Sequence, residues 1–595
     1  MLGAGNSPAA AVSLLLAGSL CLLPFLVPFH QPPILSFQAE WLAAALGIAA
    51  ALAASAVRGA RVASIPFPAR WLVAFALFLG AQPAIGHAIY PQLPLIGALY
   101  VLYAALMIWL GAQLADSCGM ERAAVALATC LLAGALANAA AGAIQFYGRP
   151  ALLEDIVAEL PYRAGAFGNI AQANLYANYL ALGATALLFL WERGKLRTGY
   201  AHAAAILLAC ACALSGSRSS LLYAFWFALL GLLAGRARQD GRRLKIAACS
   251  LAMVFLAAHV AVPWLNATFE LGTSAKSAIE RSLSVLPENV ELRWELWLLA
   301  WRVFADAPVL GAGFGEFAGA AFGSGLAPAM TQFGNEVWSS PHNLVLHLLA
   351  ETGALGGGLA LAGLCTWWWQ AGRRYLAAPQ PALWWVIAAV GIEAIHSMFE
   401  FPLWSVHFLG VTALLMGLGT RPGTSSGAAS RVTRTAAIAV CITLSLALAM
   451  LLRDYVRLDS TRITGTSVTL ASTEDAERDA GVMRALARGP LAPVTELWII
   501  LGTPPDRNDL AARLEMSGRV ARYFPANAVI VRRAVFLAFD GNATKARALL
   551  AQAVHLFPRQ CKSTMAILEQ ALASDRSAIE PLLTQAKAQM GKSCP

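Results

Sequence analysis

Long apolar stretches alternate with short polar segments through the first three-quarters of the chain. A helix needs roughly twenty mostly apolar residues to cross a bilayer, and about thirteen stretches approach or reach this length. The pattern therefore predicts an all-α, polytopic membrane protein. The predicted spans lie near residues 10–28, 41–57, 71–86, 94–115, 123–146, 171–192, 200–216, 219–235, 246–265, 343–369, 382–398, 404–419 and 435–452.

The composition supports a membrane protein. Of the residues, 58% are hydrophobic and only 13% are charged, whereas soluble domains average about a quarter charged. The net charge of +10 raises the question of nucleic acid binding. Most Lys and Arg residues, however, lie in short loops between apolar stretches, which indicates orientation in a bilayer and no nucleic acid partner. No Lys or Arg precedes the first stretch, so we expect a retained helix there.

The basic loops predict how the chain crosses the membrane. Arg and Lys gather after every second predicted span, which places those loops and the N-terminus in the cytoplasm. The opposite loops then face the periplasm and contain His30, His87, Gln172, Arg218, His342 and Glu400. We expect four regions: spans 1–9 in residues 1–265, a large periplasmic loop in 266–341, spans 10–13 in 342–453, and a periplasmic domain in 454–595.

The segment WSSPHNLVLHLLAETGALGGG, residues 338–358, joins the long polar loop to a hydrophobic helix. Proline is well tolerated in the first turn of a helix, so Pro341 predicts a helix start there. His342 would then lie at the water-facing end of a membrane helix. A neutral imidazole at this place can take or give a proton near neutral pH. The alternative is a histidine that only decorates a helix end.

Amide side chains gather in YRAGAFGNIAQANLYANY, residues 162–179. Asn169, Gln172 and Asn174 precede or open a predicted span. Amide groups hydrogen-bond sugar hydroxyls and phosphate oxygens without carrying a charge. Helix capping and hydrogen bonding between membrane helices are the alternative roles.

Two arginines on the same predicted side are candidates for phosphate binding. Arg218 lies in the tight turn SGSRSS, and a guanidinium fork matches the oxygens of a phosphate. An arginine that snorkels to lipid headgroups is the alternative. Arg293 falls on the apolar side of a predicted interfacial helix, opposite its acidic stripe. It needs an anionic partner there, either a lipid phosphate or pyrophosphate or an internal Glu.

The segment EAIHSMFEFPLW, residues 393–404, places ionisable groups in or near the bilayer. Glu393 and His396 lie three residues apart on one helix face, and Glu400 occupies a short outer turn. Intramembrane ionisable residues point to function by default. A hydrogen bond between Glu393 and His396 is the structural alternative.

Taken in order, these motifs resemble the O-antigen ligase / Wzy polymerase superfamily, and most closely its bacterial O-linked oligosaccharyltransferases, the pilin-glycosylating ligases. The resemblance covers roughly residues 160–405. The motifs are GN-x-x-Q-x-N from Gly168, S-x-S-R ending at Arg218, R-x-x-x-W from Arg293 with the P-x-x-G-x-G run from Pro308, PHN-x₇-E-x-G from Pro341, and HS-x-x-E-x-P-L-W from His396.

The resemblance implies a reaction at the periplasmic face of the bacterial inner membrane. A glycan on undecaprenyl pyrophosphate would be moved en bloc to an acceptor hydroxyl, with no cofactor and no metal. Arg218 and Arg293 would stabilise the departing pyrophosphate, and His342 would serve as the base or hold the phosphate. Phe401 stands where the oligosaccharyltransferases usually have Tyr. The implied substrate contacts are Asn169, Gln172, Asn174, Asn343, His396 and Glu400.

The polar tail predicts helical hairpins. Two Phe-Pro pairs, at 524–525 and 557–558, lie about one tetratricopeptide repeat apart. Such repeats commonly bind protein segments, although the domain could also be only a packing cap. Cys561 and Cys594 lie in this tail and could pair in an oxidising compartment.

A tail of this kind resembles that of the oligosaccharyltransferases and favours a pilin-like acceptor protein. Lipid A core and a growing glycan are the alternative acceptors. A transporter would place polar groups near the midplane and on both sides, which the pattern disfavours. A receptor or scaffold built on the tail is the last alternative.

Overall fold

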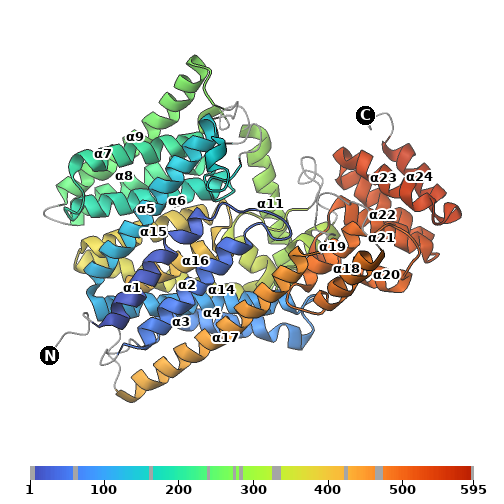
Figure 1. The fold of residues 1–595 in the computed structure, drawn as a ribbon, viewed down its shortest axis with the longest axis horizontal. Helices are drawn as coiled ribbons and strands as arrows, with labels where there is room; N and C mark the ends of the chain where they lie inside the picture. Colours follow the sequence, from blue (N-terminus) through green and yellow to red (C-terminus); the bar gives the residue numbers. More distant parts are fainter. Residues whose placement is uncertain are drawn as a thin grey trace. The chain divides into compact units, whose positions relative to one another are not determined.

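The computed structural model describes residues 7–57, 64–159, 165–237, 241–272, 277–280, 286–324, 337–420, 427–461 and 473–590. Within these ranges all regular elements are helices, as the all-α prediction requires (Figure 1). The apolar helices are α1 (Pro8–Leu20), α2 (Phe37–Ser55), α3 (Phe67–Ala81), α4 (Gln92–Leu114), α5 (Met120–Tyr147), α6 (Ala173–Glu192), α7 (Thr198–Leu214), α8 (Ser219–Ala237), α9 (Arg242–Thr268), α14 (Leu344–Ala377), α15 (Pro381–His396), α16 (Val406–Leu418) and α17 (Gly427–Asp459).

Each predicted span contains one of these helices, and the protein is a multi-pass membrane protein. In the described part of the chain, 8 helical segments are long and apolar enough to cross a membrane, and the 56-residue segment Gln92–Tyr147 holds both α4 and α5. Helices α7, α15 and α16 are apolar but shorter. The number of spans and the orientation of the chain stay predictions.

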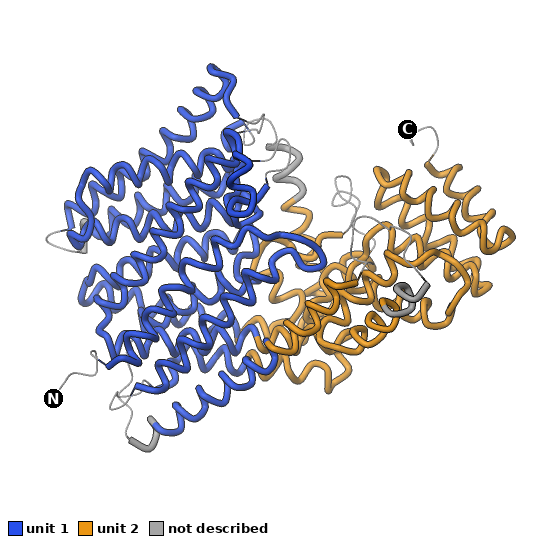
Figure 2. Tube along the Cα trace, in the orientation of Figure 1, with its two compact units in different colours: residues 1–74, 100–287, 360–448 blue, residues 75–99, 288–359, 449–595 orange. Residues whose placement is uncertain are grey.

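The chain divides into two compact units that do not follow the predicted linear regions (Figure 2). Unit 1 comprises Met1–Ala74, Tyr100–Pro287 and Ala360–Leu448. Unit 2 comprises Phe75–Leu99, Glu288–Leu359 and Ala449–Pro595. The predicted periplasmic loop and the predicted tail domain therefore lie in the same unit, together with a short segment that runs from the end of α3 to the start of α4.

Unit 1 is a bundle of apolar helices in which α8 packs on α9, α7 on α9, α5 on α6 and α1 on α2 (Figure 1). Small residues permit close approach between helices. At Gly183 of α6, for example, a Cβ would lie 2.2 Å from the Cβ of Ala135 in α5. A larger residue at this position would push the two helices apart.

Unit 2 contains the helices of the loop and of the tail. They are α11 (Leu286–Asp306), α12 (Phe317–Gly323), α18 (Thr473–Leu486), α19 (Ala492–Gly502), α20 (Leu510–Tyr523), α21 (Asn527–Phe539), α22 (Ala543–Leu556), α23 (Cys561–Leu572) and α24 (Arg576–Met590). Helices α20 to α22 agree with the helical hairpins predicted for the tail, whereas a tetratricopeptide fold stays a prediction.

The loop and the tail share one hydrophobic core. Leu296 and Leu299 of α11 and Phe322 of α12 are buried in the same cluster as Val531 and Phe536 of α21. This burial removes apolar surface of both regions from water, which is the main stabilising term in folding. The tail is thus a structural support for the two loop helices.

Candidate active site

Arg218 lies in the turn between α7 and α8, in unit 1. The Ser215 hydroxyl donates to the carbonyl of Cys212 (2.6 Å) and accepts the N–H of Ser217 (3.1 Å). Gly216 supplies the left-handed conformation that the turn needs, with φ of 63°. Arg218 itself is half-buried. Hydroxyl-to-backbone bonds therefore fix the backbone that carries this guanidinium.

The glycine segment before α6 packs against the arginine turn. The N–H of Ala166 donates to the carbonyl of Leu214 (3.0 Å). A Cβ at Gly165 would lie only 2.2 Å from the carbonyl oxygen of Ser215, so the approach requires glycine. Two motifs that lie about fifty residues apart in the sequence are therefore neighbours in unit 1.

Two amide-to-carboxyl bonds connect α6 with α15 and the turn that follows it. Nδ2 of Asn174 donates to Oε1 of Glu400 (2.7 Å), and Nδ2 of Asn178 donates to Oε1 of Glu393 (2.9 Å). Asn174 and Asn178 are four residues apart and share a helix face. The structure thus brings together two predicted site residues, Asn174 and Glu400.

Gln172 stands at the N-cap of α6. It is half-buried, and its side chain makes no capping hydrogen bond to the helix. Its carbonyl oxygen accepts the N–H of Tyr176 (2.9 Å). Its position, two residues before Asn174 at the start of the helix, suits an amide that contacts a ligand.

Asn169 has a different environment. Its Nδ2 donates to the carbonyls of Leu26 (3.0 Å) and Ile156 (2.8 Å), and its Oδ1 accepts the N–H of Ala158 (3.0 Å). Both ends of the amide therefore hold the loop before α6. This arrangement favours the structural alternative for Asn169 over contact with a substrate.

His396 is fully buried at the end of α15. The Tyr223 hydroxyl of α8 lies 2.6 Å from its Nδ1. One turn before Tyr223, the Ser220 hydroxyl lies 2.5 Å from Nε2 of His259 and also donates to the carbonyl of Ser217. A line of buried polar groups thus runs from His396 along α8 to the residues that flank Arg218.

His342 lies in unit 2, in the turn before α14. The helix begins at Leu344, so the prediction that Pro341 lies in its first turn is wrong. His342 has φ of 53°, which is incompatible with a helix, and Oδ1 of Asn343 caps α14 by accepting the N–H of Leu346 (3.1 Å). The ring of Trp338 lies 4.8 Å from that of His342.

The glycine-rich turn after α11 packs against a break in α14. Gly353 interrupts that helix with φ of 63°, and a Cβ there would lie 2.3 Å from the carbonyl oxygen of Val309. Backbone N–H groups of Ala312 and Gly313 donate to the carbonyls of Ala350 and Glu351 (2.9 and 3.1 Å). The glycines of both motifs therefore serve close backbone packing next to Glu351.

Arg293 lies in α11, also in unit 2. It is half-buried, near the face on which Leu296 and Ala300 pack into the interior. The opposite face exposes apolar side chains: Trp294 is 59% exposed and Trp301 54%. Aromatic side chains of this kind are common at membrane interfaces. The amphipathic helix of the prediction is therefore present, and its position at a bilayer stays a prediction.

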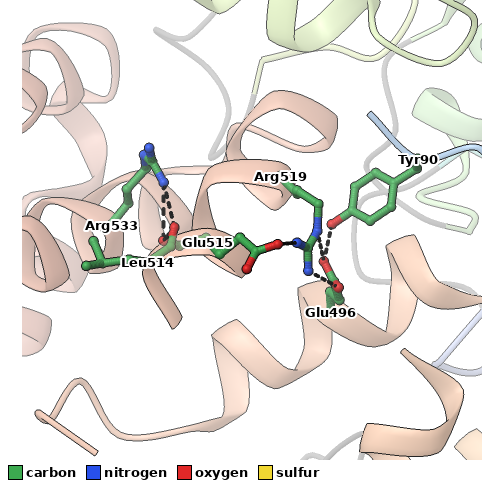
Figure 3. A network of polar contacts seen from close by, with 7 residues as sticks. Tyr90, Glu496, Leu514, Glu515, Arg519 and Arg533 are labelled. Carbon is green, nitrogen blue, oxygen red and sulfur yellow. Dashed lines mark hydrogen bonds and ion pairs between the residues drawn. The ribbon is translucent and has the colours of Figure 1, made fainter. Parts of the chain in front are cut away.

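Within unit 2, two hydrogen bonds connect the short segment before α4 to carboxylates that pair with arginines of the tail, and Figure 3 shows the one from Tyr90. Arg519 binds Glu496 through Nη2 (2.5 Å) and Nε (3.2 Å), and Tyr90 donates to the same carboxylate (2.5 Å). Burial and this hydrogen bond raise the pKa of Tyr90. Arg522 lies 3.2 Å from Glu316, which also accepts the N–H of Ile89 (2.7 Å).

Sequence reasoning missed several polar residues of these two regions. Tyr223, His259 and His347 looked like ordinary helix residues because their partners come from other helices. Asn178 lies in the predicted amide segment 162–179, where it repeats Asn174 after one helical turn, but its pairing with Glu393 was not predicted. His347 likewise follows Asn343 by four residues on α14.

A pocket of about 340 Å³ lies elsewhere in unit 1, lined by Arg373, Arg374, Ala377, Ala378, Gln380 and Leu383. It contains none of the predicted site residues. The predicted residues instead form two groups. Unit 1 holds Asn169, Gln172, Asn174, Arg218, His396 and Glu400, and unit 2 holds Arg293, His342 and Asn343.

These features define an integral membrane protein with arginine, imidazole and amide groups at the ends of its apolar helices. Residues 203–361 match the family model described as O-antigen ligase. Residues 384–571 match the model described as virulence factor membrane-bound polymerase, C-terminal.

These matches confirm the resemblance to the O-antigen ligase family that the motifs predicted. The chain is 26% identical over 502 residues to a general O-oligosaccharyltransferase of Acinetobacter baylyi (strain ATCC 33305 / BD413 / ADP1), which covers 81% of this chain and 84% of that protein. This family implies a lipid-linked glycan donor and an acceptor.

Proposed function

We propose that this protein transfers an oligosaccharide en bloc from undecaprenyl pyrophosphate to Ser or Thr of an exported, pilin-like protein at the periplasmic face. The observation that carries the proposal is the similarity of 81% of the chain to a general O-oligosaccharyltransferase. The helical tail agrees with a protein acceptor, because it provides a folded domain outside the apolar helices.

The reaction requires a base and a cation. The acceptor hydroxyl attacks the anomeric carbon of the first sugar, and its proton passes to the imidazole of His342. As the new C–O bond forms, the bond between the anomeric carbon and the phosphate oxygen breaks. Undecaprenyl pyrophosphate then leaves with both electrons of that bond. Arg218 and Arg293 stabilise the charge that develops on the departing oxygen.

Arg218 is suited to this task because its turn is rigid. The serine hydroxyls on both sides of it already bind backbone or His259. A preorganised donor does not reorganise when charge develops, which is the basis of electrostatic catalysis. Gln172 and the Asn174–Glu400 pair lie in the same unit as Arg218, and we expect them to contact the glycan or a phosphate oxygen.

Two observations support a periplasmic site. Basic loops alternate along the sequence, and all predicted site residues fall on the other side. Cys561 in the tail is disulfide-bonded, which agrees with an oxidising compartment. Cys594, its predicted partner, lies outside the described residues.

A second candidate keeps the same chemistry with another acceptor. The match of residues 384–571 to a membrane-bound polymerase model favours transfer to a growing glycan. An O-antigen ligase would instead use lipid A core.

One reconstitution separates these functions. The purified protein is incubated with undecaprenyl-pyrophosphate-linked glycan and, in parallel, a pilin-like protein, lipid A core or a glycan acceptor. We expect modified pilin. His342→Ala should lower transfer by roughly 100-fold or more, whereas His202→Ala, on an exposed position of α7, should be unaffected. Wild-type turnover by His342→Ala would show that His342 is not the base.

A further inference from the structure

The backbone of His342 adopts an uncommon conformation. Its φ of 53° lies in the left-handed region, which residues with a Cβ rarely enter. Such a conformation persists where surrounding contacts hold it, and it is concentrated at functional sites. The direction of the His342 side chain therefore depends on whatever fixes its backbone.

Ser340 makes the bond that fixes it. The N–H of His342 donates to the hydroxyl oxygen of Ser340 (3.1 Å). That oxygen lies 3.3 Å from Nδ1 of His347, one turn into α14. Both Ser340 and His347 are buried, with 6% and 3% of their surfaces exposed, so water does not replace these partners.

Glu351 contacts the other ring nitrogen of His347, so a line of contacts extends from His342 through Ser340 and His347 to this carboxylate. Nε2 of His347 lies 3.2 Å from Oε1 of Glu351, one further turn along α14. The same oxygen accepts the N–H of Phe317 at the start of α12 (3.3 Å), and the Phe317 ring packs at 5.7 Å from the imidazole. The carboxylate is thereby anchored to both α14 and α12.

The positions of the hydrogen atoms along this line follow from the groups at its two ends, the N–H of His342 and the carboxylate of Glu351. The negative charge of a Glu351 carboxylate 3.2 Å from Nε2 favours the tautomer of His347 that carries its hydrogen on that nitrogen. Nδ1 is then an acceptor and receives the Ser340 hydroxyl hydrogen. The Ser340 oxygen keeps its lone pairs for the N–H of His342. Each hydrogen bond between His342 and His347 therefore has one donor and one acceptor.

We propose that Ser340, His347 and Glu351 are positioning residues that hold His342 in its left-handed conformation and so direct its imidazole toward the acceptor hydroxyl. The inference rests on the proposed function, in which His342 is the base. None of the three touches the reacting atoms. Their effect is on the geometry of proton transfer, and donor binding is separate from it.

The test compares two substitutions of similar size at His347. His347→Leu removes the acceptor for Ser340, whereas His347→Asn places an amide oxygen near the position of Nδ1. With lipid-linked glycan and pilin-like acceptor, we expect His347→Leu to lower kcat roughly tenfold or more, because small misplacements of catalytic groups are costly. The KM for the donor should stay within about twofold, and His347→Asn should recover most of kcat.

Controls separate positioning from packing. Thr352→Val removes a buried hydroxyl of the same helix that donates to the carbonyl of Leu348, and its kcat should match wild type. Ser340→Ala should lower kcat like His347→Leu, and the double variant should lose little more than either, since both act through one line. If His347→Leu does not reach the membrane, the kcat of Ser340→Ala alone tests the positioning role.

The outcomes also distinguish this inference from the proposed function. If His342→Ala is inactive while Ser340→Ala and His347→Leu keep wild-type kcat, the positioning role is overturned and the base stands. Equal losses in His347→Leu and His347→Asn would likewise overturn it. If His342→Ala is fully active, the proposed base itself fails.

Discussion

The two units pair their buried carboxyl groups with different partners. In unit 1, Glu393 and Glu400 accept hydrogen bonds from the neutral amides of Asn178 and Asn174. In unit 2, Glu496 and Glu316 pair with the cations of Arg519 and Arg522. The acidic groups are similarly buried in both units, at 2 to 5% exposed.

The surroundings of the partners explain the difference. Asn178 is fully buried among apolar helices, where a second charge would add a large desolvation cost. The side chains of Arg519 and Arg522 are 31% and 67% exposed, so they keep much of their hydration. The hydrogen bond to Glu496 raises the pKa of Arg519 further. A neutral donor is therefore the suitable partner inside the bundle, and arginine outside it.

The largest expected effect comes from breaking a neutral pair. Asn178→Leu would leave Glu393 buried without this donor, at an expected cost of about 3 kcal/mol. Replacing both residues, in Asn178→Leu with Glu393→Leu, should recover most of that loss, because no polar group is then stranded. Thermal unfolding in detergent measures both. A single variant as stable as wild type would mean that the pair does not matter.

A charged pair in unit 2 should matter less. Glu496→Gln keeps an acceptor for Tyr90 but removes the charge facing Arg519, and we expect a loss of about 1–2 kcal/mol. Faster proteolysis of the tail would report it. Glu580→Gln, in an exposed pair with Arg576 at 3.8 Å, is the matched control and should be neutral. Equal effects in the two variants would contradict the comparison.

The smallest effect concerns pH. Burial raises the pKa of Glu316, although the N–H of Ile89 and Arg522 oppose it. A raised folded-state pKa means that stability is complete below the unfolded pKa and is lost as pH rises through the folded one. Glu316→Gln keeps an acceptor and does not ionise. The free energy of unfolding of Glu316→Gln should therefore exceed that of the wild type between about pH 4 and pH 7, by less than about 1 kcal/mol.

Unfolding midpoints of the two proteins across this range provide the check on Glu316. A difference between them that does not change with pH would show that the carboxyl group has an ordinary pKa.

The fold was largely predictable because hydrophobic stretches report helices directly. Every predicted span contains a helix, and the tail is helical, as predicted. The start of α14 was missed because Pro341 carries a strong helix-start signal, while the left-handed His342 and the cap from Asn343 depend on the neighbouring chain.

Site residues could be predicted from the sequence only where the residue type itself indicates the chemistry, as arginine does for phosphate binding and histidine for proton transfer. Arg218 and His342 stood out in polar turns next to spans. The partners Tyr223 and His347 did not, because a pair formed between separate elements leaves no local pattern. Asn169 is the opposite case, since the sequence left its role open and its amide is bound on both ends by backbone.

The most direct test of the proposed function is the intact mass of a pilin-like acceptor after incubation with the purified protein and undecaprenyl-pyrophosphate-linked oligosaccharide. We predict one mass increase equal to the whole oligosaccharide, located on Ser or Thr, with release of undecaprenyl pyrophosphate. An unmodified acceptor, together with lengthened lipid-linked glycan or glycosylated lipid A core, would contradict transfer to protein.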